Sequence, residues 1–122
     1  MKIRIKTNSV RYRLNRTDVQ QLASTGYLED KVAFWQQTLV YAIQAADTEE
    51  LSSSFKNNVI TLYVPQTMID ELESTERVGF ENNNGPVHLL VEKDFTCLEN
   101  VAEDQGDNYP NPLAVKYDEQ RR

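Results

Sequence analysis

Apolar and basic residues alternate along the first fourteen positions of the chain, in two runs at residues 2–6 and 10–14. A period of two is the side-chain period of a β-strand. Asn8 and Ser9, between the two runs, are residues that favour turns. The opening therefore predicts a β-hairpin that carries its apolar residues on one face and its basic residues on the other.

A short helix, through about Thr25, and two further strands are predicted next. Thr17-Asp18-Val19-Gln20 matches a capping box, in which the first and fourth side chains bond each other's backbone N–H groups. Gly26 suits the left-handed residue that follows many helices. Residues 27–35 and 38–45 are rich in aromatic and β-branched residues, which favour strands.

The second half of the chain begins with a polar segment, residues 47–58, which predicts a connector. A strand is predicted at residues 59–64 and a helix at residues 65–74, opened by a proline in its first turn. A last pair of strands is predicted at residues 78–81 and 87–95, joined by a turn rich in asparagine.

Residues 60–95 repeat the pattern of residues 10–45 at an offset of fifty positions, so each half is predicted to form strand, helix, strand, strand. Either duplication or convergent patterning would produce this match. We therefore expect an α+β fold with an antiparallel or mixed sheet of about seven strands, open or curled into a partial barrel, and two short helices. Residues 1–98 would form this single domain. Residues 99–122 would form an acidic tail containing prolines, either disordered or packed over the domain through its bulky residues.

Composition narrows the class of protein. No apolar run approaches the roughly 20 residues that span a bilayer, and the N-terminus has no signal-peptide block. The one cysteine, Cys97, cannot form an internal disulfide. These features predict a cytoplasmic protein with no membrane partner. The net charge of -6 and the pI near 4.8 argue against a binder of duplex nucleic acid.

Charge is nevertheless segregated along the chain, since residues 1–16 carry six basic residues and no acid. Alternation would bring five of them into one patch on the predicted hairpin. Like charges that face each other across strands repel, so something negative is expected beside them. The candidate anion-binding residues are Lys2, Arg4, Lys6, Arg11 and Arg13.

Three kinds of negative partner are open at this point. Glu92 and Asp94, on one face of the last predicted strand, could be counter-charges in an ordinary surface ladder. A phosphate-bearing or other small anionic ligand could be held by arginine forks. An acidic partner protein could dock on the same patch.

Residues for catalysis or metal binding are scarce. The only histidine, His88, lies about 13 Å along a strand from Glu92, and no second histidine or cysteine completes a metal site. No phosphate-binding loop and no nucleophile motif occurs. We therefore expect no metal site, identify no catalytic residue or cofactor, and favour a protein that is not an enzyme.

Three segments resemble a family of uncharacterised bacterial proteins of about this length. They are MKIRIKTNSVRYRL at the start, EKDFTCL at residues 92–98 and DNYPNP at residues 107–112. The resemblance spans the whole chain and implies a bacterial cytosolic protein of unknown function, with no assigned active site.

A more distant likeness is to the CYTH superfamily, whose antiparallel tunnel binds triphosphates with a divalent metal. Under this likeness the five basic residues, with Glu92 and Asp94, would line the tunnel wall. The chain departs from the superfamily because it has no N-terminal ExExK motif and is short for an eight-stranded tunnel.

The favoured function is thus a non-enzymatic binding or interaction domain, whose basic hairpin engages an anionic small molecule or an acidic protein. One alternative is a metal-dependent enzyme that handles phosphate or polyphosphate with the same basic face. Another is an assembly protein that acts as a homodimer or other homo-oligomer, because isologous pairing is the commonest form of assembly.

Overall fold

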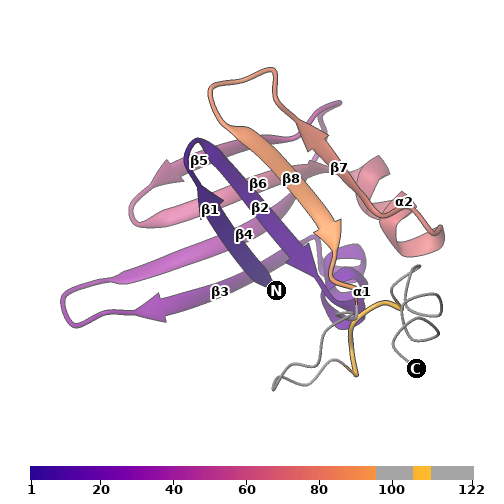
Figure 1. The fold of residues 1–122 in the computed structure, drawn as a ribbon, viewed down its shortest axis with the longest axis horizontal. Helices are drawn as coiled ribbons and strands as arrows, with labels where there is room; N and C mark the ends of the chain where they lie inside the picture. The colour runs from indigo at the N-terminus through magenta and orange to yellow at the C-terminus, as the bar shows by residue number, and fades with distance from the viewer. Residues whose placement is uncertain (96–105, 111–122) are drawn as a thin grey trace, which may run out of the picture.

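In the computed structural model, residues 1–95 and 106–110 are described, and these form eight strands and two helices (Figure 1). The elements are β1 (Lys2–Lys6), β2 (Ser9–Leu14), α1 (Arg16–Thr25), β3 (Tyr27–Ala33), β4 (Thr38–Ala46), β5 (Ser52–Lys56), β6 (Val59–Pro65), α2 (Gln66–Ser74), β7 (Gly79–Asn82) and β8 (His88–Lys93). The α+β class with two helices is confirmed.

The strands form two four-stranded sheets, with the orders β1-β2-β8-β7 and β3-β4-β6-β5. In each sheet two antiparallel hairpins meet at a central parallel pair, β2 with β8 or β4 with β6. Figure 1 shows one sheet in front of the other, with strands in crossing directions and both helices at one end. In place of the single sheet of about seven strands that was predicted, eight strands form two four-stranded mixed sheets, and the described residues form no closed barrel. The chain crosses from one sheet to the other after α1, so neither sheet continues far enough to close.

Both halves of the chain have the order strand, strand, helix, strand, strand. β1 and β5 start and end fifty positions apart, as Lys2–Lys6 and Ser52–Lys56. Thr7 and Asn57, in the corresponding turns, both have positive φ, 51° and 52°. Each sheet combines the first hairpin of one half with the last hairpin of the other. The two halves are therefore intertwined, and neither completes a sheet by itself.

The strand β5 lies inside residues 47–58, which the sequence pattern predicted as a connector. Within the described part of the chain β5 pairs only with β6, at the edge of its sheet. Its serine run carries no strand signal, and its one large apolar residue, Phe55, is 70% exposed. An edge strand that buries so little needs no apolar alternation, so the second half of the chain has one strand more than was predicted.

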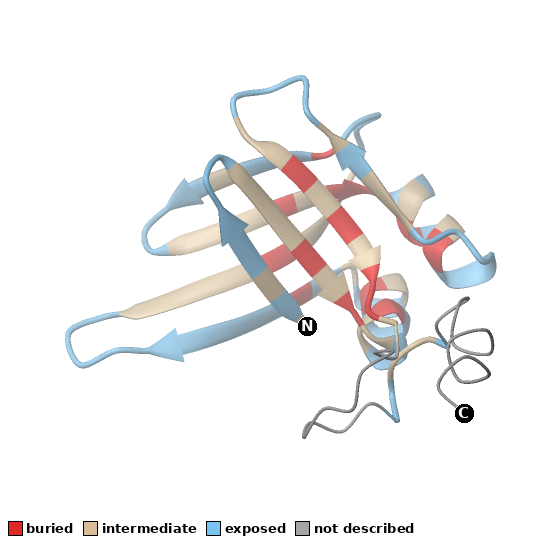
Figure 2. Ribbon diagram, viewed as in Figure 1, coloured by how far each residue is buried: buried red, intermediate tan, exposed pale blue. Residues whose placement is uncertain are grey.

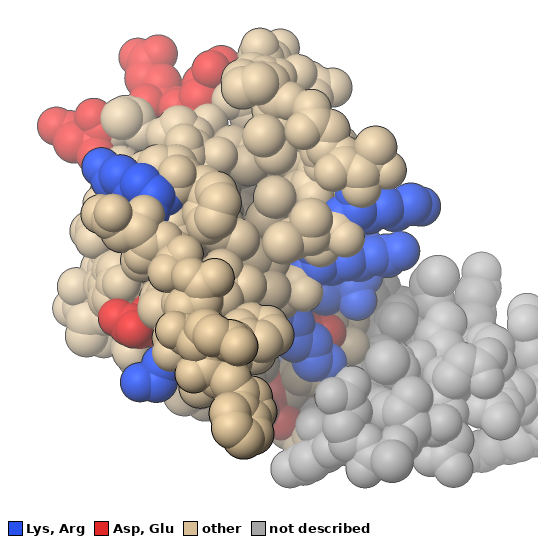
Figure 3. Space-filling model, turned by 90° about the vertical axis from the view of Figure 1, so that its left-hand side faces the viewer, with Lys and Arg blue, Asp and Glu red and all other residues tan. Residues whose placement is uncertain are grey.

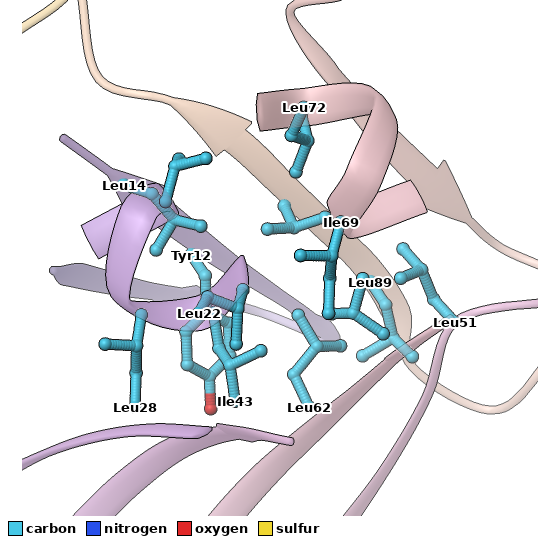
Figure 4. Packing of buried hydrophobic residues seen from close by; sticks show 13 residues of the cluster. Tyr12, Leu14, Leu22, Leu28, Ile43, Leu51, Leu62, Ile69, Leu72 and Leu89 are labelled. Carbon is cyan, nitrogen blue, oxygen red and sulfur yellow. The ribbon is translucent and has the colours of Figure 1, made fainter. Parts of the chain in front are cut away.

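The core lies between the two sheets and beneath the helices, where Figure 2 shows the buried residues gathered. In Figure 4, Leu22 of α1 and Ile69 of α2 point toward Leu62 of β6. All three side chains are fully buried. Tyr12 of β2 spans the space between the sheets and donates a hydrogen bond to the Ile60 carbonyl of β6, at 3.1 Å. Burial raises the pKa of Tyr12 well above its ordinary value.

The start of α1 lies two residues earlier than the predicted capping box. The Asn15 side chain accepts a hydrogen bond from the Asp18 backbone at 2.8 Å, and the Asp18 carboxylate accepts one from the Asn15 backbone at 3.0 Å. Because β2 ends at Leu14, the next residue caps the helix, and Thr17 falls inside the first turn. The predicted C-cap is confirmed, since Gly26 is left-handed with φ of 76°.

Asn15→Ala is therefore expected to lower the free energy of unfolding by about 1 kcal/mol, the usual cost of removing an N-cap side chain. Thr17→Ala is the matched control and should change it by less than about 0.5 kcal/mol, because Thr17 is exposed. Urea unfolding followed by circular dichroism measures both. A loss at Thr17 as large as that at Asn15 would contradict the observed cap.

Residues 106–110 lie beside the end of β8. The Tyr109 backbone donates to the Asp94 carbonyl at 2.9 Å, and the Arg16 backbone donates to the Asp107 carbonyl at 3.1 Å. Tyr109 packs against the core, as the packed alternative for the tail predicts. Cys97 and the other bulky tail residues, Leu113, Val115 and Tyr117, lie outside the described residues.

Candidate functional site

The predicted basic residues share the outer face of the β1-β2-β8-β7 sheet. Lys2 lies opposite Arg13, and Arg4 lies opposite Arg11, across β1 and β2. On the other side of β2, Arg13 lies opposite Glu92 of β8. Tyr12, between the two β2 arginines, is buried, so the basic side chains face outward. We call this surface the basic face and define it by Lys2, Arg4, Lys6, Arg11 and Arg13.

Part of the basic face is neutralised by the two predicted carboxylates. Glu92 lies between the two β2 arginines, with its Oε1 at 3.1 Å from Arg13 Nε and 3.5 Å from Arg11 Nε. Asp94 is buried, and its Oδ2 lies 3.1 Å from Lys2 Nζ. These contacts match the surface ladder that was one of the three open interpretations.

The remaining part of the basic face keeps its charge. Arg4 and Lys6 are exposed, and neither has an ion-pair partner within residues 1–95 and 106–110. Arg4 also lies directly opposite Arg11, an unfavourable pairing of like charges. Figure 3 shows Lys and Arg side chains gathered along one side of the molecule, the side of the β1-β2-β8-β7 sheet. The basic face therefore presents positive charge that no described carboxylate neutralises.

His88 contacts a single carboxylate among residues 1–95 and 106–110. His88 Nε2 lies 2.8 Å from Glu81 Oε2, and both side chains are at the surface. Among the described residues, no group of three or more His, Cys, Asp or Glu side chains is arranged to hold a metal ion. Cys97 lies outside the described part of the chain.

Sequence reasoning missed an exposed apolar end of the molecule, at the side away from the helices. Trp35, in the β3–β4 turn, is 100% exposed, and its neighbour Phe34 is largely exposed. Ile5, Val32 and Phe55 occupy strand positions on the inner faces but also remain exposed. Figure 1 shows the β3–β4 and β5–β6 hairpins extending past the front sheet at this end of the molecule. The alternation that predicts burial carries no signal for where the opposing sheet ends.

Sequence reasoning also missed Lys93, the last residue of β8. It lies opposite Leu14 on the inner face, and only 5% of it is exposed. Alternation places residue 93 on the inner face, but a lysine at that position gives no reason to expect full burial.

Three comparisons with known proteins bear on the chain. A family model described as "Family of unknown function (DUF7009)" matches residues 1–113. The predicted resemblance to an uncharacterised family is therefore confirmed. No curated protein and no solved structure matches the chain. In the described part of the chain, neither helix has the length and apolar character needed to cross a membrane.

Proposed function

We propose, for a chain that belongs to the DUF7009 family of unknown function, that the domain is a non-enzymatic interaction module whose basic face binds an acidic partner. One observation carries the proposal: Arg4 and Lys6 are exposed on the same face of β1, without a counter-charge among the described residues. The partner would supply the missing negative charge.

The geometry of the basic face favours an extended protein segment over a small ligand. The side chains of Lys2 and Arg13 are 46% and 42% exposed on an open sheet surface, and an open surface encloses a small molecule poorly. β1 is also the edge of its sheet, so the backbone on its outer side faces no other strand among residues 1–95 and 106–110. An acidic segment could therefore pair with the β1 backbone while its carboxylates contact Arg4 and Lys6.

The two alternative functions stay predictions. A phosphate-handling enzyme would need the basic residues and Glu92 to converge in a concave site, whereas these side chains spread over a sheet face. A homo-oligomer is supported by a different surface, the exposed apolar end around Trp35.

The test is a binding titration with a fluorescently labelled oligo-glutamate peptide, in low salt, followed by anisotropy. Arg4→Ala/Lys6→Ala protein should bind the peptide at least tenfold more weakly than wild type, because two charge-assisted contacts are lost. These two substitutions leave the Glu92 and Asp94 ion pairs intact. Unlabelled triphosphate should compete poorly, since a compact anion spans little of the face.

Lys31→Ala/Lys56→Ala protein is the matched control. It removes the same net charge from two exposed positions on the other sheet, β3 and β5. Its affinity for the peptide should stay within about twofold of wild type, a difference too small to indicate a contact. Equal weakening in both double variants, or no binding by wild type, would contradict the proposal.

A further inference from the structure

A cavity of about 490 Å³ lies at the helix-bearing end of the domain, separate from the basic face. Its walls come from the end of β8, the segment after α2, the start of α1 and the return segment at residues 106–110. The lining residues used below are Arg16, Glu76, Val78, Lys93, Phe95 and Tyr109. The volume is in the range of sites that hold small organic molecules.

Backbone hydrogen bonds hold the wall that carries Tyr109. The Asp94 backbone donates to the Leu14 carbonyl at 2.8 Å, and the Tyr109 backbone donates to the Asp94 carbonyl at 2.9 Å. The rings of Phe95 and Tyr109 meet edge to face, with centroids 6.2 Å apart. The return segment is therefore fixed beside β8, and the cavity is part of the folded domain.

Lys93 brings a buried ammonium group to this cavity. Its Nζ donates one hydrogen bond, to the Thr75 carbonyl at 2.9 Å, and lies 4.8 Å from the centroid of the Tyr109 ring. This hydrogen bond satisfies a carbonyl at the end of α2 and uses one of the three N–H donors of Nζ. No carboxylate lies within ion-pair distance of Nζ among the described residues. Burial lowers the pKa of Lys93, and the charge of Glu76 partly opposes that effect.

Arg16 brings a second positive charge against the same aromatic ring. Its Cζ lies 5.5 Å from the Tyr109 centroid, and the side chain is exposed. Within the described residues Arg16 also has no ion-pair partner. Two cations thus converge on Tyr109 at a cavity whose other walls include Val78 and Phe95.

We propose that this cavity binds a small organic carboxylate with an apolar body. The carboxylate would sit between Lys93 and Arg16, where it would accept their free N–H donors. The apolar body would pack against Val78 and Phe95. A single negative charge fits better than a polyphosphate, because Glu76 on the cavity wall already offsets one of the two cations. The inference is independent of the proposed function, which uses other residues on another face.

The experiment titrates the full chain with benzoate, phenylacetate and hexanoate, and follows backbone amide signals by NMR. At least one carboxylate should bind with a dissociation constant of about 1 mM or lower, as expected for ligands of this size. The amide signals of Val78, Phe95 and Tyr109 should shift most. Benzamide, which has the shape of benzoate without its charge, should bind at least tenfold more weakly than benzoate if benzoate is the ligand that binds.

Variants distinguish direct contacts of Lys93 and Arg16 with the carboxylate from a general effect of positive charge. Arg16→Gln, at an exposed position, should weaken carboxylate binding about tenfold. Lys93→Met should abolish it, although that change also removes the bond to Thr75. Arg4→Ala/Lys6→Ala protein should bind the carboxylates as wild type does, even if it has lost the acidic peptide. Absence of binding by all three carboxylates, signal shifts elsewhere, or unchanged binding by Arg16→Gln protein would overturn the proposal.

Discussion

Leu62→Ala is expected to lower the free energy of unfolding by about 2–5 kcal/mol, the range for removing a large aliphatic side chain from a core. Leu62 is fully buried on β6, in a central position of its sheet. Leu28 and Ile43 lie beside Leu62 in the same cross-strand row of the sheet. The two helices pack over the side chains of that row (Figure 4). A cavity here is enclosed by two sheets and two helices, so the surroundings cannot collapse freely into it.

Urea unfolding followed by far-ultraviolet circular dichroism measures this loss, and Val32→Ala is its control. Val32 lies on the inner face of the same sheet but is 43% exposed, at the end away from the helices. Its truncation should cost less than about 1 kcal/mol, because little apolar surface leaves a packed environment. Similar losses at both positions would show that the uncovered end is part of the packed core, contrary to the burial described above.

The second large effect is expected for Gly79→Ala on β7, with a loss of about 1–3 kcal/mol. An alanine Cβ at this position would overlap the Val91 carbonyl oxygen and would lie 2.8 Å from Glu92 Cα. Both atoms belong to the backbone of β8, which is held between β2 and β7 and cannot turn aside as a side chain can. β7 would have to move away from β8, with loss of their hydrogen bonds.

Gly85→Ala provides the comparison for Gly79. Gly85 lies in the loop between β7 and β8, and a Cβ there meets no atom within 4 Å. Its substitution should change the free energy of unfolding by less than about 0.5 kcal/mol. Thermal unfolding of both variants by circular dichroism distinguishes the cases, and equal stability of the two variants would show that β7 does not approach β8 so closely.

Sequence pattern was sufficient where neighbouring residues decide the structure. Alternation along residues 2–6 and 10–14 predicted β1, β2 and the common face of their basic residues. The same rule placed Glu92 and Asp94 on one face of the last predicted strand, as candidate counter-charges, and Glu92 Oε1 accepts a hydrogen bond from Arg13 Nε. The residue that caps a helix was harder to predict, because both Asn15 and Thr17 are good capping residues and the end of β2 decides between them.

Pattern was insufficient where residues distant in the chain decide the structure. β2 pairs with β8 in parallel, Val10 opposite Leu89, and no local signal specifies a partner so distant. That pairing produces two sheets instead of one, and it places Lys93 beside the end of α2, where Thr75 accepts its hydrogen bond. The polar edge strand β5 is recognisable only once β6 is known to lie beside it.

Trp35, fully exposed in the β3–β4 turn, is the only tryptophan in the chain. The indole of the native protein is therefore already hydrated, and unfolding should change its fluorescence very little. Coverage of this turn by a second copy or by another protein would instead move its emission to shorter wavelengths. Trp35 fluorescence thus reports contacts at the apolar end of the domain and is nearly insensitive to unfolding of the domain.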